Sequence, residues 1–146
     1  MNSILITGGA GFIGTNAAVY FSKKNWEVTL LDNLSRKGAR KNLDWIRKIN
    51  QNIKFFNYDI KNFDSILGII SKNKFDFILH LAAQVAVTTS CSNPREDFNT
   101  NALGTFNLLE AIRVSSPNSF FINASTNKVY GSLSDEPTKL YSNGYK

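Results

Sequence analysis

Short apolar runs and helical patterns alternate through the first part of the chain. Residues 2–7 are apolar and rich in β-formers, and Gly8-Gly9-Ala10-Gly11 follows them. Residues 12–24 then fit a helix, and residues 27–31 fit a second strand, which Asp32 follows. A strand–helix–strand unit of about 30 residues has room for the crossover that makes two strands parallel. We therefore expect the strands at 2–7 and 27–31 to be parallel.

The same alternation continues to residue 123. Apolar residues at 43, 46 and 49 predict a second helix, and residues 53–58 predict a third strand. Asn62 suits the N-cap of a helix with apolar positions 66, 67, 69 and 70, and residues 75–81 follow as an apolar strand. Asn93 and Pro94 then predict one long helix, which Ser116 and Pro117 end before a fifth strand at 119–123. The expected apolar face of this helix is Phe98, Ala102, Phe106, Leu109 and Ile112.

This order of elements predicts the fold class: α/β, with a Rossmann-like, doubly wound parallel sheet of strand order 3-2-1-4-5. The ligand crevice of such a sheet lies outside the carboxyl ends of the strands, beside the first and fourth strands here. We expect one domain over residues 1–131 and an irregular tail over 132–146, where no further helix or strand is predicted.

Composition and charge narrow the classes of function. The net charge of +6 suits an anionic partner, but the basic residues are scattered and form no nucleic-acid motif, so no nucleic-acid partner is expected. Arg36, Lys37, Arg40 and Lys41 fall where a phosphate or adenine would lie. The apolar start of the chain is too short to span a bilayer and has no basic leader, so no membrane anchor is predicted. The single cysteine, Cys91, cannot form an internal disulfide, which makes the cytoplasm the default location. No metal site is predicted.

The first candidate site is the glycine motif Gly8-x-x-Gly11-x-x-Gly14 between the first strand and the first helix. Glycines allow a sharp turn, let the backbone approach a pyrophosphate without an intervening Cβ, and let the helix pack closely on the strand. Phosphates at such a turn meet free N–H groups and the positive end of the helix. Glycine turns are common, so it is the position after a strand that favours a phosphate site here.

Two aspartates follow predicted strands. Asp32 lies 18 residues after Gly14, close to the roughly 20 expected for the carboxylate that binds the adenosine ribose. This favours NAD, because a carboxylate repels the extra phosphate of NADP, although Arg36 would partly offset that repulsion. The alternative is that Asp32 only caps a turn. Asp59 either meets the exocyclic amine of adenine or is itself a turn residue.

His80 is the single histidine, and it lies in the apolar run at 75–81. A lone histidine in an apolar strand is usually a buried core residue whose ring nitrogens are hydrogen-bonded. We therefore interpret His80 as structural and not catalytic.

Six motifs follow one another along the chain. They are Thr7-Gly-Gly-Ala-Gly-Phe-Ile-Gly14, Asp32-Asn-Leu34, Asp59-Ile60, His80-Leu-Ala-Ala-Gln84, Asn101-Ala-Leu-Gly-Thr105 and Ser125-Thr-Asn-Lys-Val-Tyr-Gly131. In this order they resemble the extended short-chain dehydrogenase/reductase family, which includes nucleotide-sugar epimerases and dehydratases, over essentially the whole chain. A narrower similarity, carried by residues 32–38, 84–90 and 125–128, is to the CDP-tyvelose (CDP-paratose) 2-epimerases.

The resemblance implies NAD as cofactor and a role for each matching residue. The residues at the pyrophosphate would be Gly8, Gly11, Phe12, Ile13 and Gly14, and those around the adenosine would be Asp32, Asn33, Ser35 and Arg36. Adenine would lie between Asp59 and Ile60, and the path to nicotinamide would be lined by Leu81, Ala82, Ala83 and Gln84. Asn101 is similar to the family's buried asparagine on the helix after the fourth strand.

Thr126 matches the serine or threonine that hydrogen-bonds the reacting sugar hydroxyl in this family. Threonines also end strands by bonding their own backbone, and it is the flanking residues 127–131 that favour the catalytic role. In the family, a tyrosinate removes the hydroxyl proton as hydride passes to NAD⁺, and the keto-sugar rotates before hydride returns. In the 2-epimerases the carbon concerned is C2 of a CDP-linked dideoxy sugar.

The family's catalytic Tyr-x-x-x-Lys pair belongs on a helix after the fifth strand, and residues 124–146 do not contain it. Tyr130 has Ser134 at the lysine position, and Tyr141 precedes Lys146 by five residues. We therefore expect the NAD-binding portion of a nucleotide-sugar epimerase, truncated before the last strands and the substrate lobe and inactive alone. Its partners would be a CDP-sugar in the full-length protein and either a second copy or a complementing fragment.

Two alternatives stay open. One is a nucleotide-sugar 4-epimerase or 4,6-dehydratase, although a dehydratase favours an acidic pair directly after Thr126, where this chain has Asn127-Lys128. The other is a non-catalytic NAD-binding module. If the chain is only a fragment, an exposed sheet edge beyond the fifth strand should make it aggregate or require a partner.

Overall fold

The computed structural model describes residues 1–131, 137, 139–141 and 144–145. Within these residues, five strands form one sheet in the order β3-β2-β1-β4-β5, and every neighbouring pair is parallel. The strands are β1 (Ser3–Thr7), β2 (Glu27–Leu31), β3 (Lys54–Phe56), β4 (Phe77–His80) and β5 (Phe120–Asn123). The predicted fold class and strand order are confirmed. Thr7 is level with Leu31 of β2 and His80 of β4, so these three strands end side by side.

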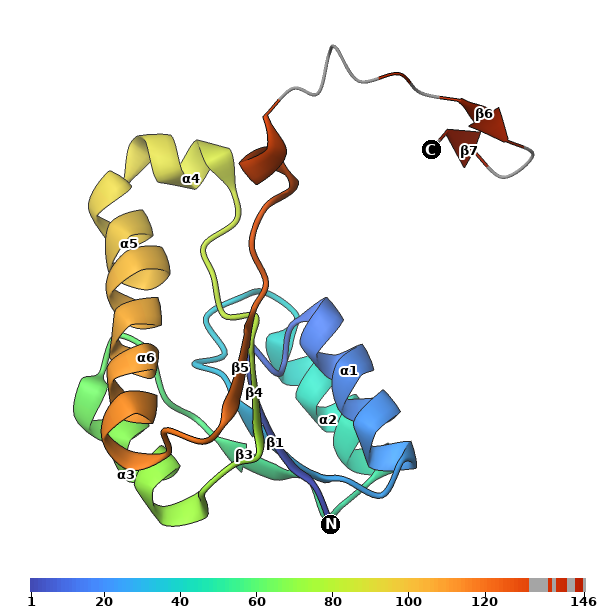
Figure 1. Ribbon diagram of the computed structural model, residues 1–146, viewed down its shortest axis with the longest axis vertical. Coiled ribbons are helices and arrows are strands. Elements are labelled where there is room, and N and C mark those ends of the chain that lie inside the picture. The colour runs from blue at the N-terminus through green and yellow to red at the C-terminus, as the bar shows by residue number, and fades with distance from the viewer. Residues whose placement is uncertain (132–136, 138, 142–143, 146) are drawn as a thin grey trace.

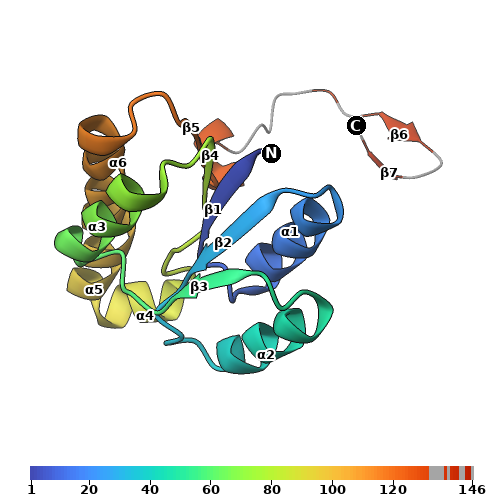
Figure 2. The ribbon, with the colours of Figure 1, turned by 90° about the horizontal axis from the view of Figure 1, so that it is seen from below.

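Helices cover both faces of the sheet (Figures 1 and 2). Helices α1 (Phe12–Lys23) and α2 (Ala39–Ile49) pack on one face, and α3 (Phe63–Asn73) and α6 (Gly104–Ser115) pack on the other. Successive strand residues point to opposite faces, so Leu5 belongs to the core beneath α3 and α6 while Ile4 and Ile6 belong to the core beneath α1 and α2.

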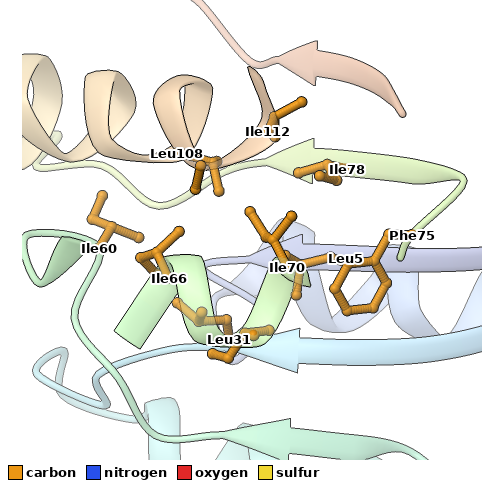
Figure 3. Packing of buried hydrophobic residues seen from close by; sticks show 11 residues of the cluster. Leu5, Leu31, Ile60, Ile66, Ile70, Phe75, Ile78, Leu108 and Ile112 are labelled. Atoms are coloured by element: carbon orange, nitrogen blue, oxygen red, sulfur yellow. The ribbon is translucent and has the colours of Figure 1, made fainter. Parts of the chain in front are cut away.

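The core on the α3 and α6 side shows how the sheet positions these helices (Figure 3). Each buried aliphatic side chain contributes about 1.5–3 kcal/mol relative to its exposed state. The strands supply Leu5, Leu31 and Ile78, and the helices supply Ile66, Ile70, Leu108 and Ile112. Two predicted caps are also confirmed: Asn62 Oδ1 accepts from Ser65 N at 3.0 Å, and Asn93 Oδ1 accepts from Glu96 N at 3.2 Å.

The long helix predicted after Asn93 is confirmed as one continuous helical run over residues 94–115. It is not α-helical throughout, because a π-helical turn η1 (Asn99–Leu103) lies between α5 (Pro94–Phe98) and α6. The predicted apolar face is wrong except at Ile112, which is buried, whereas Phe98 and Phe106 are 63% and 61% exposed. The buried face is Gly104, Asn107, Leu108, Ala111 and Ile112.

Two residues explain why α6 buries a less apolar face. A Cβ on Gly104 would lie 2.6 Å from Ile60 Cδ1, so glycine lets the helix approach the segment after β3 closely. Asn107 Nδ2 donates to the carbonyls of Ile60 at 3.1 Å and Lys61 at 3.0 Å, which satisfies its buried amide. Hydrophobic periodicity favoured the bulkier residues because it takes no account of close approach or of buried hydrogen bonds.

Several short elements were not predicted. They are α4 (Val87–Ser92), the 3₁₀ turn η2 (Asn127–Tyr130), and the antiparallel pair β6 (Leu140–Tyr141) and β7 (Gly144–Tyr145). The expectation of no strand after Gly131 is therefore wrong for β6 and β7, whose two-residue strands are too short for an alternating pattern to reveal. The remainder of the predicted tail, residues 132–136, 138, 142–143 and 146, lies outside the described residues. Among the helices of the described part, none has the length and apolar character needed to cross a membrane.

Candidate functional site

A cavity of about 640 Å³ lies at the carboxyl ends of the parallel strands, where the glycine loop enters α1. Its position is the one that the reversal of strand order in the sheet predicts. The residues predicted to bind the cofactor line this cavity, with the exception of Asn101. They are Gly8, Gly11, Phe12, Ile13, Gly14, Asp32, Asn33, Ser35, Arg36, Asp59, Ile60, Leu81, Ala82, Ala83 and Gln84.

The glycine loop packs backbone against backbone. Gly8 has a φ of +68°, and a Cβ placed on it would lie 2.8 Å from Ala82 N. A Cβ on Gly14 would lie 2.4 Å from Gly8 O and 2.8 Å from Gly9 Cα. Real Cβ atoms do not approach backbone atoms this closely, so neither position accepts a side chain without movement of the loop.

The start of α1 faces the cavity with its backbone donors. Gly11 is the N-cap residue, and no described side chain caps this helix. Gly11 N donates to Gly8 O at 3.0 Å, and the Thr15 hydroxyl donates back to Gly11 O at 2.5 Å, which holds the turn. The first amides of a helix have no partner within the helix, and together with the helix dipole they favour an anion.

Asp32 performs two tasks in the structure. Its Oδ2 accepts from Ala10 N at 3.0 Å and its Oδ1 accepts from Leu34 N at 2.8 Å. The carboxylate therefore ties the glycine loop to the turn after β2, as the turn-capping alternative predicted. It also lines the cavity beside Arg36, as the ribose-binding hypothesis requires.

Asp59 belongs to a chain of polar contacts across one end of the cavity. Its Oδ2 accepts from Asn33 Nδ2 at 2.9 Å, and its Oδ1 accepts from Lys61 N at 2.9 Å, a turn-forming contact. Lys61 Nζ lies 2.6 Å from Glu96 Oε1 and 3.6 Å from Asp59 Oδ2. The hydrogen bond to Glu96 raises the pKa of Lys61 above its ordinary value, against a smaller opposing effect of burial. Two loops and α5 are thus held together at this end.

His80 is buried and hydrogen-bonded, as predicted. It is 2% exposed, with Thr7 Oγ1 at 2.6 Å from Nδ1 and Thr105 Oγ1 at 2.9 Å from Nε2. Burial lowers the pKa of His80 to about 4, so the ring is neutral near pH 7. It is not among the residues that line the cavity.

Asn101 lies outside the cavity and is half-buried, in place of the buried position expected. Its Oδ1 accepts from Gln84 N at 2.8 Å and its Nδ2 donates to Gln84 O at 2.9 Å. Both bonds are to the backbone of one residue, so Asn101 fixes the loop after β4. Its contact with the site is therefore indirect.

Thr126 is exposed and follows Ser125, which lines the cavity. Thr126 itself is not among the lining residues and lies next to them in the chain, just after β5. Tyr20 and Lys24 have the spacing of the family's tyrosine–lysine pair, but they belong to the far end of α1 and line no part of the cavity.

Lys37, expected from the sequence to lie near a phosphate or adenine, also lines the cavity. Other cavity residues were not singled out from the sequence as site residues. They are Ala10, Leu31, Ala39, Asn42, Tyr58, Val85, Glu96, Thr100, Ala124 and Ser125. Glu96 and Thr100 are four residues apart at the end of α5 and in η1, a spacing that puts both on one helix side and was a usable signal. Asn42, whose Nδ2 donates to Ala10 O at 2.8 Å, carried no such signal. Among the described residues, no group of three or more His, Cys, Asp or Glu side chains is arranged to hold a metal ion.

Comparison with known proteins gives a family and several relatives. The model of the family described as GDP-mannose 4,6 dehydratase matches residues 5–142. CDP-paratose 2-epimerase of Salmonella typhi is 47% identical over 130 residues, which are 89% of this chain and 38% of that protein.

Solved structures that match in both sequence and fold include two 4-epimerases. The UDP-Glc/GlcNAc 4-epimerase of Campylobacter jejuni is 35% identical with a TM-score of 0.82, over 90% of this chain and 39% of that one. The UDP-glucose-4-epimerase of Stenotrophomonas maltophila was solved with bound NAD and formylated UDP-arabinopyranose. It is 28% identical with a TM-score of 0.84, over 94% of this chain and 40% of that one. The chain thus spans about two fifths of the length of each relative.

Substitution of two glycines by alanine should change stability in opposite directions. We expect Gly14→Ala to lower the free energy of unfolding by about 1–3 kcal/mol, because its Cβ has no room against the glycine loop. The matched control is Gly68→Ala in α3, where a Cβ meets no atom within 4 Å; alanine there should raise stability by about 0.5–1 kcal/mol. Urea denaturation of the three proteins measures both effects. A Gly14→Ala protein as stable as wild type would contradict the packing described here.

Proposed function

The chain belongs to the GDP-mannose 4,6 dehydratase family, and from this premise we propose that it is the NAD-binding portion of a nucleotide-sugar epimerase. The reaction that we propose for the whole protein is epimerisation at C2 of a CDP-linked sugar. The proposal has three parts, which are the cofactor, the chemistry and the substrate.

The observation that carries the proposal is the close backbone packing of the glycine loop. Because Gly8 and Gly14 leave no space for a side chain, the uncapped start of α1 faces the cavity directly. Backbone N–H groups and the positive end of a helix suit a diphosphate. A cavity of about 640 Å³ is also within the range of 300–1,000 Å³ that is usual for cofactor sites. These residues therefore fit the diphosphate of NAD.

The nucleoside end of NAD fits the polar residues after β2 and β3. Asp32 is positioned by two backbone amides and lines the cavity, where its carboxylate would accept hydrogen bonds from the adenosine ribose. Asp59 and Ile60 line the wall where adenine would lie. The charge of Asp32 favours NAD over NADP, and nearby Arg36 only partly offsets it.

The chemistry that we assign to this chain is binding of the cofactor and orientation of the nicotinamide and the sugar hydroxyl. When bound, nicotinamide accepts a hydride from the sugar and returns it. Leu81, Ala82, Ala83 and Gln84 would line the path to the nicotinamide, and Asn101 fixes that loop through Gln84. Thr126, which follows the lining residue Ser125, would hydrogen-bond the reacting sugar hydroxyl and hold it in one orientation. The general base and the sugar-binding lobe would belong to the remainder of the full-length protein, so we expect the 146-residue chain alone to be inactive.

Epimerisation at C2 is the finer part of the proposal. The 47% identity to CDP-paratose 2-epimerase supports it, as does Asn127-Lys128 after Thr126. A 4,6-dehydratase would favour an acidic pair at that place. Epimerisation at C4 is the second candidate, and the two 4-epimerase structures with TM-scores of 0.82 and 0.84 favour it. The remaining alternative, a non-catalytic NAD-binding module, would use the same cavity without a role for Thr126.

The cytoplasm remains the proposed location, and the exposed free thiol of Cys91 is compatible with it.

Titration with the two dinucleotides tests the proposed cofactor. We expect the chain to bind NAD at least tenfold more tightly than NADP. Asp32→Asn should lower the affinity for NAD by about ten- to a hundredfold, because a hydrogen bond to a charged group contributes about 1.5–3 kcal/mol. Asp44→Asn, an exposed aspartate of α2 outside the cavity, is the matched control and should bind as wild type does. Isothermal titration calorimetry measures all three proteins. Tighter binding of NADP by wild type would contradict the cofactor assignment.

Two chimeras test the proposed reaction. In one, residues 1–146 replace the aligned part of CDP-paratose 2-epimerase, and in the other they replace the aligned part of a UDP-glucose 4-epimerase. We expect turnover in the first chimera and little in the second, each assayed with its parent's own substrate. Thr126→Val should lower kcat of the active chimera by about 10²–10³, because it removes a hydrogen bond made to the reacting group, whereas Thr126→Ser keeps the hydroxyl. Turnover by the 4-epimerase chimera alone would contradict C2 epimerisation and favour the second candidate.

A further inference from the structure

The His80 ring lies between two threonine hydroxyl groups from different elements. On one side Thr7 Oγ1, at the end of β1, is 2.6 Å from Nδ1, and on the other Thr105 Oγ1, in α6, is 2.9 Å from Nε2. The ring is buried, so these two hydroxyl groups are its polar partners in the described structure. A neutral imidazole carries one proton and therefore donates to only one of them.

Counting protons determines which ring nitrogen carries the hydrogen. Thr105 Oγ1 donates its single proton to Asn101 O at 2.7 Å, so toward His80 it is an acceptor. Nε2 must therefore be protonated, and Nδ1 must be the acceptor for the hydroxyl proton of Thr7. His80 is thus held as its Nε2–H tautomer.

The hydroxyl oxygen of Thr7 also accepts hydrogen bonds from the loop after β4. Once its proton points to His80, the two lone pairs of Thr7 Oγ1 face Leu81 N at 3.3 Å and Ala82 N at 3.4 Å. Ala82 N is the atom that a Cβ on Gly8 would meet at 2.8 Å. The hydroxyl of Thr7 therefore connects the start of the glycine loop to the loop after β4 at their point of closest approach.

The other end of the network reaches the same loop from the helix. Asn101, whose carbonyl accepts from Thr105, holds both Gln84 N and Gln84 O through its side-chain amide. The π-helical turn η1 contains Asn101, and π-turns are frequent at functional sites. The ring of His80 thus lies at the centre of one continuous chain of hydrogen bonds. That chain joins the glycine loop, the loop at 81–84 and η1.

We propose that His80 is a positioning residue for the cofactor cavity, acting through the fixed direction of this hydrogen-bond chain. The proposal rests on the proposed NAD site. His80 is not among the residues that line the cavity. It acts through Thr7 on the glycine loop and through Thr105 and Asn101 on the 81–84 loop. A ring protonated on both nitrogens would direct a third donor at Thr7 Oγ1, whose lone pairs are already engaged. Only the neutral Nε2–H form satisfies every group in the chain.

The ring nitrogens can be observed directly, because His80 is the single histidine. A long-range ¹H–¹⁵N correlation spectrum of the untagged chain near pH 7, without cofactor, should show Nε2 protonated and Nδ1 unprotonated. A protonated Nδ1, or an even mixture of the two tautomers, would overturn the proposal. This measurement uses the wild-type chain and so does not depend on how any variant folds.

Thr105 provides the variant that tests positioning. Thr105→Val removes the acceptor for Nε2–H and the donor to Asn101, whereas Thr105→Ser keeps the hydroxyl. Without cofactor, we expect Thr105→Val to shift the backbone amide resonances of Gly8, Ala82 and Gln84. In calorimetry it should bind NAD at least tenfold more weakly than wild type. Thr105→Ser should restore both properties, and Thr89→Val, an exposed threonine of α4, should leave them unchanged.

The outcomes separate this proposal from the proposed function. Unchanged loop resonances in Thr105→Val, or NAD affinity equal to wild type, would overturn positioning by His80. Shifted resonances in Thr105→Val together with no NAD binding by the wild-type chain would contradict the proposed function and leave the hydrogen-bond chain supported. If Thr105→Val does not fold, the tautomer of the wild-type ring decides.

Discussion

The site depends on one steric constraint, the contact of backbone with backbone where the glycine loop meets the loop after β4. Gly8 adopts a positive φ against Ala82, and Gly14 lies against Gly8 O at a distance that excludes any side chain. This packing brings the uncapped start of α1 to the carboxyl ends of the strands. A helix start with free amides at this place favours an anionic group, and a diphosphate has the charge and size to use it.

The other features of the site extend from that contact. Asp32 bonds both the glycine loop and the turn after β2, so the carboxylate proposed to bind the ribose also holds the loop proposed to bind the diphosphate. Asn101 holds Gln84, and His80 connects Thr7 to Thr105 across the sheet. Binding a dinucleotide in an extended form requires these separate loops to keep fixed relative positions, and hydrogen bonds between them provide that. The similarity to epimerases over about two fifths of their length fits a binding unit of this kind.

Much of the fold was predictable because local rules and tertiary packing agree. The strand order, the caps at Asn62 and Asn93, and the buried His80 were all read from the sequence. The buried face of the helix after Asn93 was not, because a π-turn changes the helical phase and because Gly104 and Asn107 are buried for reasons that hydrophobicity does not encode. The candidate site was likewise only partly predictable from the sequence. Motif spacing found the cavity residues after β1 and β2, but Asn42 reaches the cavity through a tertiary contact that no local pattern marks.

The central claim is that the glycine loop and the start of α1 bind the diphosphate of NAD. Backbone amide spectra of the ¹⁵N-labelled chain, recorded during titration with NAD, test it most directly. We expect saturable shifts of the amides of Gly8, Gly11 and Gly14 and of Asp32, with the exposed helix surface of α2 unchanged. Unperturbed amides at all three glycines, or shifts only of residues outside the cavity, would contradict binding of the diphosphate at this loop.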